Sequence, residues 1–279
     1  MKILITGFEP FDGAEKNPSW EAVNGVTKVP EGVELKRALL PTVYKASSEM
    51  LMALMLKHRP DAVLGFGLAG IRSEITVERI AVNLADARIP DNSGAQPVDE
   101  PLFEDGPAAY FATLPAKEIC GAINDAGVKA SLSNTAGLFV CNSVMYSALY
   151  FAEKYMPDTK AGFIHIPGGS DPADDIKAAE AAIAAAAKSL QERGKKMITI
   201  VYMQGCPYCR MARKAVEELG AEGSVTWVDE NAEPAKIKDL DYYYVPSIFD
   251  GTKKLFEAHP GDDYEKIRDA VQAALDLAK

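Results

Sequence analysis

The chain of 279 residues is long enough for two modest domains or one large one, and its 48% hydrophobic and 25% charged residues are ordinary for a soluble globular protein. A net charge of −10, a pI of about 4.9 and the lack of a Lys/Arg block argue against a nucleic-acid or anionic-membrane partner. No apolar run is long enough to span a membrane or to form a signal peptide. Four cysteines without such a signal are typical of the reducing cytosol, so we expect a cytoplasmic protein.

Apolar runs that alternate with amphipathic stretches fill residues 1–193. Strands are predicted at residues 2–8, 33–40, 61–67, 75–83, 128–134 and 161–167. Helices are predicted at residues 18–26, 44–59, 115–126, 141–155 and 171–193. Near-continuous apolar strands are typical of parallel strands covered on both faces, whereas the alternation in residues 75–83 indicates an antiparallel strand or arm. We therefore expect an α/β domain with three α/β/α layers around a mostly parallel sheet.

Two polar loops lie in this part of the chain. Residues 9–20 follow the first strand directly, and in open α/β sheets ligands bind at the carboxyl ends of the strands. Residues 86–101 are crowded with Pro, Gly and Asn, and loops of that length in compact domains are usually functional or disordered. The first loop is therefore a candidate ligand contact, and for the second both possibilities stay open.

A second α/β run begins behind a very short connector, which we predict at residues 192–196. Strands are predicted at residues 197–203 and 224–230, and two more within residues 245–257 are joined by Asp250-Gly251, a strong hairpin signal. Helices are predicted at residues 207–219, 232–240 and 262–277. About 85 residues with these elements are enough for a complete small α/β domain. We therefore predict two domains, residues 1–194 and 195–279.

Cys141 lies at or just before the start of a predicted helix. The first backbone N–H groups of a helix lack partners and carry partial positive charge, which stabilises a thiolate. The pKa of Cys141 is thus expected to fall toward neutrality, so that the sulfur can attack a carbonyl. The alternative is a buried cysteine that packs as a small hydrophobic residue.

Only three histidines, His58, His165 and His259, could act as a base for this cysteine. His165 lies near the carboxyl end of a buried strand, at the same predicted sheet edge as the Cys141 turn, so the two side chains can meet. His58 lies in a charged helix end, and His259 belongs to the other predicted domain. His165 is therefore the candidate base, with a satisfied core histidine as the alternative.

Seven short motifs, in this order, resemble those of the type I pyroglutamyl peptidases (pyrrolidone-carboxylate peptidases). They are GFEPF at 7–11, NPSWE at 17–21, GLAG at 67–70, Glu78-Arg79 with Asn83, DARIPDN at 86–92, SNTAG with VCN between 133 and 142, and GFIHIP at 162–167. Members of that family are cysteine peptidases that remove an N-terminal pyroglutamyl residue. The resemblance covers residues 1–193 and implies peptides with N-terminal pyroglutamate as substrates.

The resemblance implies a catalytic triad. The family's nucleophile falls on Cys141, its general base on His165, and the carboxylate that orients the base on Glu78. Arg88 matches a family arginine near the site. For Glu78 the alternative is a solvated strand carboxylate. The implied reaction is acyl transfer through the Cys141 sulfur and needs no cofactor and no metal.

The resemblance also implies residues that bind the substrate. Phe8 and Phe11 match the family's ring-binding pair, Phe139 could supply another wall, and Asn17 is a candidate contact of the lactam. For each phenylalanine the alternative is an ordinary core residue.

Two positions near this candidate pocket depart from the family pattern. Leu68 stands where the family has glutamine, so it keeps that contact only if the contact runs through the main chain. Ile71 stands where the family has glycine. A homo-oligomer is also expected.

Cys206-Pro207-Tyr208-Cys209 follows a predicted strand and opens a predicted helix, and it resembles the redox site of glutaredoxins and other thioredoxin-like proteins. The resemblance implies that Cys206 attacks a disulfide and Cys209 resolves the mixed disulfide. Pro246 matches the family's cis-proline. The implied partners are disulfides, with glutathione or another thiol as reductant. A half zinc site is the weaker alternative, since no second Cys/His pair with ligand spacing exists.

The sequence thus favours a cysteine exopeptidase with an appended thiol–disulfide oxidoreductase. The alternative is a protein that is mainly an oxidoreductase, with a degenerate peptide-binding module in front. The Cys141, His165 and Glu78 set favours the first. A third possibility is that the second domain keeps Cys141 reduced, because accessible thiols of low pKa oxidise readily.

Overall fold

The computed structural model describes residues 1–194 and 197–277, and the chain divides into two compact units, Met1–Leu190 and Gln191–Lys279. Part of the connector predicted at residues 192–196, namely residues 195 and 196, lies outside the described residues. Within the described parts of the chain, no helix has both the length and the apolar character needed to cross a membrane.

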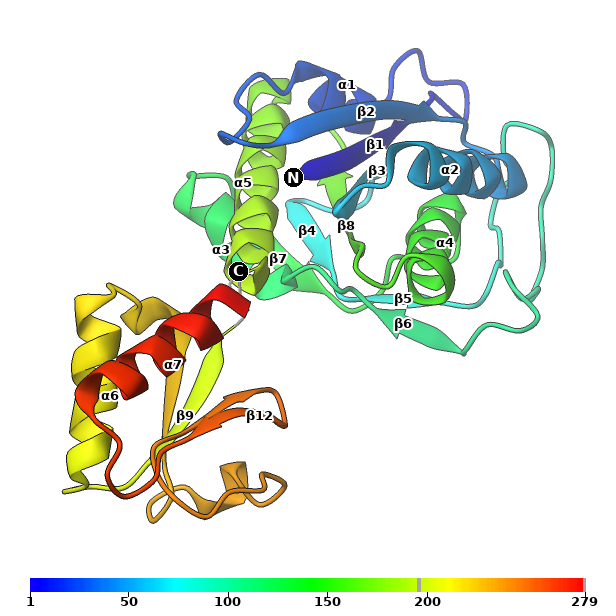
Figure 1. The fold of residues 1–279 in the computed structure, drawn as a ribbon. Helices are drawn as coiled ribbons and strands as arrows, with labels where there is room; N and C mark the ends of the chain where they lie inside the picture. The colour runs from blue at the N-terminus through cyan, green and yellow to red at the C-terminus, as the bar shows by residue number, and fades with distance from the viewer. Residues whose placement is uncertain (195–196, 278–279) are drawn as a thin grey trace. The chain divides into compact units, whose positions relative to one another are not determined.

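The first unit is built on a six-stranded mixed sheet with the order β2-β1-β3-β8-β4-β7 (Figure 1). Its strands are β1 (Lys2–Phe8), β2 (Glu34–Leu40), β3 (Ala62–Ala69), β4 (Ile75–Glu78), β7 (Ala130–Ser133) and β8 (Lys160–Pro167). Neighbouring strands are parallel except β4 and β8, which are antiparallel. The predicted α/β class is confirmed, and the antiparallel pair brings the end of β4 beside the middle of β8.

Five helices cover the two faces of this sheet. They are α1 (Pro18–Gly25), α2 (Tyr44–His58), α3 (Ala116–Asp125), α4 (Val140–Tyr155) and α5 (Pro172–Gly194). Successive side chains of β1 point to opposite faces, so Leu4 packs in the core formed with α2 and α4, whereas Ile3 and Ile5 pack in the core formed with α1, α3 and α5. With helices on both faces of the sheet, the unit has three layers. Each fully buried aliphatic side chain in these two cores contributes about 2 kcal/mol to the stability of the fold.

The segment predicted as one strand at residues 75–83 is two strands, and the single-strand prediction is wrong at Arg79. The Arg79 backbone N–H donates to the carbonyl of Ser133, and its carbonyl accepts from the N–H of Ala112, so the chain leaves the main sheet there. β5 (Ile80–Val82) then pairs with β6 (Ala109–Phe111), a short strand that the sequence did not predict. As a result Glu78 is the last residue of β4.

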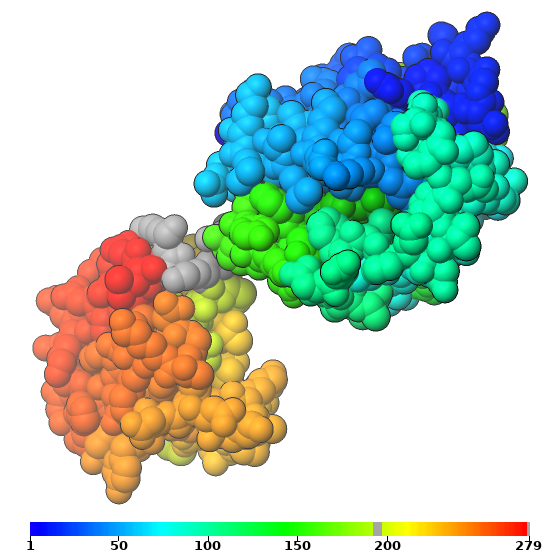
Figure 2. Space-filling model, turned by 90° about the vertical axis from the view of Figure 1, so that its right-hand side faces the viewer, coloured from blue at the N-terminus to red at the C-terminus, as the bar shows by residue number. Residues whose placement is uncertain are grey.

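The long loop at residues 86–101 is organised by one buried carboxylate. Asp91 accepts hydrogen bonds from the backbone N–H groups of Tyr44, Ser93 and Ala95 and from the Ser93 hydroxyl, at 2.7–3.0 Å. The bond to Tyr44 ties the loop to the first residue of α2. Figure 2 shows this loop, in turquoise, beside α2, in light blue, on one face of the unit. Of the two possibilities that the sequence left open, disorder is thus the one that the structure does not support.

The second unit has a four-stranded sheet with the order β10-β9-β11-β12. Its elements are β9 (Ile198–Tyr202), α6 (Pro207–Glu218), β10 (Val225–Asp229), β11 (Ser247–Asp250), β12 (Lys253–Glu257) and α7 (Tyr264–Leu277). β9 and β10 are parallel, and β11 is antiparallel to both β9 and β12. The hairpin predicted at Asp250-Gly251 is confirmed. Both helices pack with Ile198, Ile200 and Ile248 in one core.

The helix predicted at residues 232–240 is wrong, because only the 3₁₀ turn Pro234–Lys236 forms there. Pro234 has no N–H to donate, and the Asp229 carboxylate accepts from the N–H groups of Asn231 and Ala232, which favours a series of turns. These turns place Ile237 over Phe249, on the sheet face opposite α6 and α7.

Candidate active site

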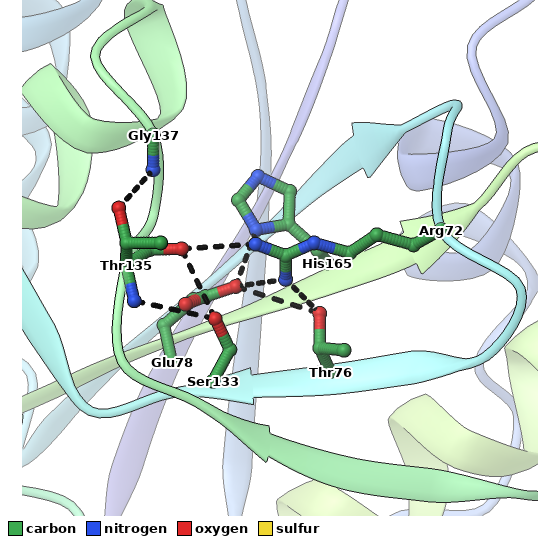
Figure 3. A network of polar contacts seen from close by, with 7 residues as sticks. All are labelled: Arg72, Thr76, Glu78, Ser133, Thr135, Gly137 and His165. Atoms are coloured by element: carbon green, nitrogen blue, oxygen red, sulfur yellow. Dashed lines mark hydrogen bonds and ion pairs between the residues drawn. The ribbon is translucent and has the colours of Figure 1, made fainter.

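The mixed sheet brings Glu78 and His165 together. β4 runs antiparallel to β8 with Thr76 opposite His165, so the carboxylate of Glu78 lies beside the imidazole. His165 Nδ1 lies 2.8 Å from Glu78 Oε1, and the two residues are 4% and 0% exposed (Figure 3). A buried hydrogen bond of this length fixes the orientation of the ring.

This contact also determines which ring nitrogen is available. The carboxylate accepts, so the proton sits on Nδ1, and Nε2, which points away from Glu78 in Figure 3, can accept a proton. Burial lowers the pKa of His165 below its ordinary value, although the hydrogen bond and the charge of Glu78 act in the opposite direction. The imidazole is therefore neutral near pH 7 and suited to act as a base.

Cys141 is the second residue of α4, whose first turn has no side-chain cap. Its sulfur lies over Gly67 of β3, since a Cβ built on Gly67 would be 2.6 Å from Sγ. Gly67 in turn pairs with His165 across β3 and β8. The Cys141 sulfur therefore lies over the strand position next to His165, and both side chains line one cavity of about 450 Å³. Among the described residues no hydrogen bond joins them.

The lowered thiol pKa expected for Cys141 is wrong. Burial raises the pKa of Cys141 to about 12, the negative charge of Glu78 adds to the rise, and Arg72 only partly offsets it. The loss of water around the sulfur is the largest cause of the rise. Cys141 and His165 can rest as a neutral thiol and imidazole or as a thiolate and imidazolium. The raised thiol pKa favours the neutral pair.

The same cavity is lined by most of the other predicted site residues. Phe11, Leu68, Arg88 and Phe139 all contribute to its wall, with the rings of Phe11 and Phe139 6.0 Å apart. Ile71 lines it as well and is 99% exposed. Part of the wall thus combines two aromatic rings with aliphatic side chains, which suits a small uncharged ring, and the rest carries the charged side chains of Asp12, Arg72, Asp86 and Arg88.

Phe8 and Asn17 lie outside this cavity. Phe8 is a core residue that packs against Phe163, with ring centroids 6.3 Å apart. Asn17 caps α1: its Oδ1 accepts from the N–H and the hydroxyl of Ser19, and its Nδ2 donates to the Glu9 carbonyl. The polar atoms of Asn17 are thus engaged in the loop that holds Phe11.

Known proteins resemble the first unit closely. A family model described as pyroglutamyl peptidase matches residues 1–192. The chain is 51% identical over 175 residues to the pyrrolidone-carboxylate peptidase of Thermococcus kodakarensis, covering 63% of this chain and 85% of the relative. It is 53% identical over 167 residues to the Streptococcus pyogenes enzyme of the same name, covering 60% and 78%.

The chain belongs to the pyroglutamyl peptidase family. The crystal structure of pyroglutamyl peptidase I from Bacillus amyloliquefaciens superimposes with a TM-score of 0.63 at 42% identity, covering 67% of this chain and 97% of that one. The pyrrolidone carboxyl peptidase of Thermococcus litoralis gives 0.64 at 38% identity, covering 69% and 96%. The resemblance inferred from the seven motifs is confirmed for the first unit, and the family match ends at residue 192, within the first residues of the second unit.

Arg72, which the sequence does not single out, also belongs to this pyroglutamyl peptidase site. Its guanidinium contacts Glu78 Oε1 and Thr76 Oγ1 and donates to the Thr135 carbonyl at 2.9 Å (Figure 3). The available signal was an arginine in the turn between two buried strands, the second of which ends in a carboxylate. Arg88, the arginine singled out from sequence, lines the cavity and is exposed.

In the second unit the cysteines lie at the start of α6, beyond the end of the match to the pyroglutamyl peptidases. Cys206 is the N-cap, and its sulfur accepts from the backbone N–H of Cys209 at 3.3 Å. The Cys206 thiol also lies 3.5 Å from the Val245 carbonyl, directly before the cis peptide bond to Pro246. Both cysteines are free thiols, and burial raises the pKa of Cys209 to about 12, with the hydrogen bond to Cys206 adding to the rise.

Proposed function

We propose that residues 1–194 form a cysteine exopeptidase that hydrolyses the bond after an N-terminal pyroglutamyl (5-oxoprolyl) residue, with Cys141 as nucleophile, His165 as general base and Glu78 as the orienting carboxylate. The observation that carries this proposal is the buried contact of 2.8 Å between His165 Nδ1 and Glu78 Oε1 beside the cavity that Cys141 lines. Family membership supports it, because the relatives are named pyrrolidone-carboxylate peptidases.

In the first step His165 Nε2 removes the thiol proton of Cys141 as the sulfur attacks the pyroglutamyl carbonyl. Because the resting pair is neutral, the proton moves during attack, and the imidazolium that forms faces the negative charge of Glu78. Glu78 is thus proposed to stabilise a charge that exists only along the reaction path.

The tetrahedral intermediate carries an oxyanion near the start of α4. The uncapped first turn leaves backbone N–H groups around Cys141 for that oxygen, and each such donor contributes about 3 kcal/mol. His165 then gives its proton to the departing amine, which leaves an acyl thioester on Cys141. Water, deprotonated by His165, cleaves the thioester and releases 5-oxoproline and the free thiol.

The substrate ring is proposed to lie between apolar walls. Pyroglutamate carries no charge on its ring, so the faces of Phe11 and Phe139 with Leu68 favour it over a charged N-terminal residue. Arg88 lines the same cavity, and we propose that it orients polar groups near the reacting carbonyl. Phe8 and Asn17 lie outside the cavity and are left out of the proposed contacts.

The test is hydrolysis of pyroglutamyl aminomethylcoumarin amide by the full chain, with prolyl and glutamyl amides as controls. We expect release of the fluorophore from the pyroglutamyl amide and little from the other two, because proline lacks the lactam carbonyl and glutamate would bring charges between the rings of Phe11 and Phe139. Absence of turnover with the reduced protein would contradict the proposal and favour the alternative, a degenerate peptide-binding module.

For the second unit we propose a thioredoxin-like domain, residues 195–279, that acts as a thiol–disulfide oxidoreductase. Cys206 attacks a disulfide sulfur and forms a mixed disulfide while one thiol leaves, and Cys209 then attacks Cys206 and releases the second thiol. The hydrogen bond from the Cys209 N–H to the Cys206 sulfur supports this assignment of roles. Glutathione or another thiol is proposed to reduce the resulting disulfide, and Pro246 to border the site.

Cys206→Ser is expected to reduce disulfide reductase activity to background, because a serine hydroxyl does not take part in thiol exchange. Cys209→Ser keeps the attacking thiol and is expected to accumulate the mixed disulfide. The assay is reduction of a glutathione mixed disulfide and, separately, of a protein disulfide. Both variants should hydrolyse the pyroglutamyl amide at the wild-type rate under reducing conditions. Full reductase activity in Cys206→Ser would contradict the assignment.

A further inference from the structure

One arginine contacts Glu78 of the proposed triad but takes no part in the proposed reaction steps. Arg72 follows β3, and 22% of its side chain is exposed. One terminal nitrogen contacts both Glu78 Oε1 and Thr76 Oγ1, and the other donates to the Thr135 carbonyl. Figure 3 shows the guanidinium beside the imidazole, above Glu78 and Thr76. Three directed contacts of this kind hold a planar guanidinium in one orientation.

Arg72 and His165 share a single carboxylate oxygen. Glu78 Oε1 lies 2.8 Å from His165 Nδ1 and is also the oxygen that Arg72 contacts. Glu78 is fully buried, and a neutral imidazole cannot balance its charge. Arg72 is thus the permanent positive charge beside a carboxylate that must stay ionised to support the imidazolium.

The third contact connects the carboxylate to the loop that leads to the nucleophile. Thr135 accepts from Arg72 through its carbonyl, and its hydroxyl accepts from the Gly137 N–H at 3.1 Å. That loop runs into α4, where Cys141 is the second residue. Arg72 therefore links β4, which supplies Glu78, to the segment that places the sulfur.

We propose that Arg72 is a positioning residue of this peptidase. It keeps Glu78 ionised and fixed, and it ties Glu78 to the loop before α4. Its positive charge also lies beside His165 and Cys141 while they exchange a proton. This inference rests on the proposed function of the first unit.

The charge of Arg72 shifts the pKa of His165 and the pKa of Cys141 in the same direction. Burial lowers the pKa of His165, Glu78 raises it, and Arg72 lowers it; burial and Glu78 raise the pKa of Cys141, and Arg72 lowers it. The other charged groups that line the cavity are Asp12, Asp86 and Arg88. Removing the charge of Arg72 therefore raises the pKa of both partners, so both limbs of the pH–activity profile move to higher pH.

The test compares Arg72→Gln, which keeps hydrogen-bonding capacity without charge, with Arg72→Lys, which keeps charge without the planar fork. The control is Arg79→Gln, because Arg79 follows Glu78 directly but bonds the exposed side chain of Asn134. Two quantities are measured against pH: kcat and KM for the pyroglutamyl amide, and the rate of iodoacetamide alkylation at Cys141, followed by mass spectrometry of the peptide that contains it.

For Arg72→Gln we expect kcat to fall about 10- to 100-fold with little change in KM, and both the activity limbs and the alkylation profile to move up by about one pH unit. Arg72→Lys should restore the position of the profile with only part of kcat, and Arg79→Gln should resemble wild type. If Arg72→Gln does not fold, Arg72→Met, which also removes the charge, takes its place with the same expected shift of both profiles.

In Arg72→Gln, a fall in kcat with unmoved profiles would reduce Arg72 to a structural tie and overturn the proposal, as would wild-type kinetics in that variant. The alkylation profile does not depend on turnover. A wild type that hydrolyses no pyroglutamyl amide but whose Cys141 profile still moves in Arg72→Gln would remove the proposed function and keep the electrostatic role of Arg72.

Discussion

Cys141→Ala is expected to lower kcat for a pyroglutamyl amide by at least about 10⁴-fold, because alanine cannot form the acyl thioester on which the proposed reaction depends. The loss should leave the fold intact. Cys141 is a partly exposed residue at the first turn of α4, and alanine is the best helix former. The measurement is kcat and KM with thermal unfolding of the same preparation. Binding of 5-oxoproline, measured by calorimetry, should survive, since the apolar walls are unchanged.

The matched control is Cys120→Ala. Cys120 is buried in α3 and hydrogen-bonded to Asn124, and it does not line the cavity. The same atoms are removed in both variants, so loss of rate in Cys141→Ala but not in Cys120→Ala assigns the effect to the reacting sulfur. Comparable rates in the two variants would exclude the covalent mechanism.

Glu78→Gln is expected to lower kcat by about 10³- to 10⁴-fold. The amide is close in shape but neutral, so the imidazolium formed during attack no longer faces a negative charge, and Arg72 loses its counter-charge. If the amide nitrogen instead turns toward His165, it donates to Nδ1 and forces the proton onto Nε2, where it blocks the base. In either orientation of the amide, we expect a large fall in kcat and only a small change in KM.

Glu74→Gln is the control for this variant, because Glu74 immediately precedes β4 and pairs with Lys129 at the surface. We expect wild-type kinetics from it. Stability should also separate the two changes, since hydrogen bonding keeps the pKa of Glu78 below its ordinary value despite burial. Wild type should therefore lose the stability contributed by this group as pH falls through its pKa, a dependence that Glu78→Gln lacks. Activity of Glu78→Gln within tenfold of wild type would contradict the triad.

The sequence predicts the parts of this fold that local chemistry determines. β1 and β8 are continuous apolar runs, and the predicted residues 2–8 and 161–167 agree with the observed strands to within one residue. The hairpin at Asp250-Gly251 follows from the need for a positive φ, which Gly251 adopts at +59°. β6 was missed because its three residues become a strand only by pairing with β5.

In the candidate site, too, the sequence predicts what local patterns determine and misses what depends on the packing of distant segments. Cys141 and His165 lie at element ends that the pattern makes visible, so their convergence could be predicted. The pKa of Cys141 could not, because it depends on how much protein surrounds the sulfur. The contact between Arg72 and Glu78 depends on the register of β4 against β8, and no spacing in the sequence encodes that register. Phe8 and Phe11 look alike in sequence, yet the last residue of β1 enters the core and the loop residue faces the cavity.

Gly67 has a consequence for chemical inhibition. The space that its missing side chain leaves is filled by the Cys141 sulfur, and the ring of Phe163 closes the neighbouring side. The sulfur is thus backed by main chain and an aromatic ring, and an electrophilic warhead must approach it through the cavity that Phe11 and Ile71 help to line. A selective covalent inhibitor therefore needs a slim reactive head with its bulk pointing outward, because the wall behind the thiol cannot yield.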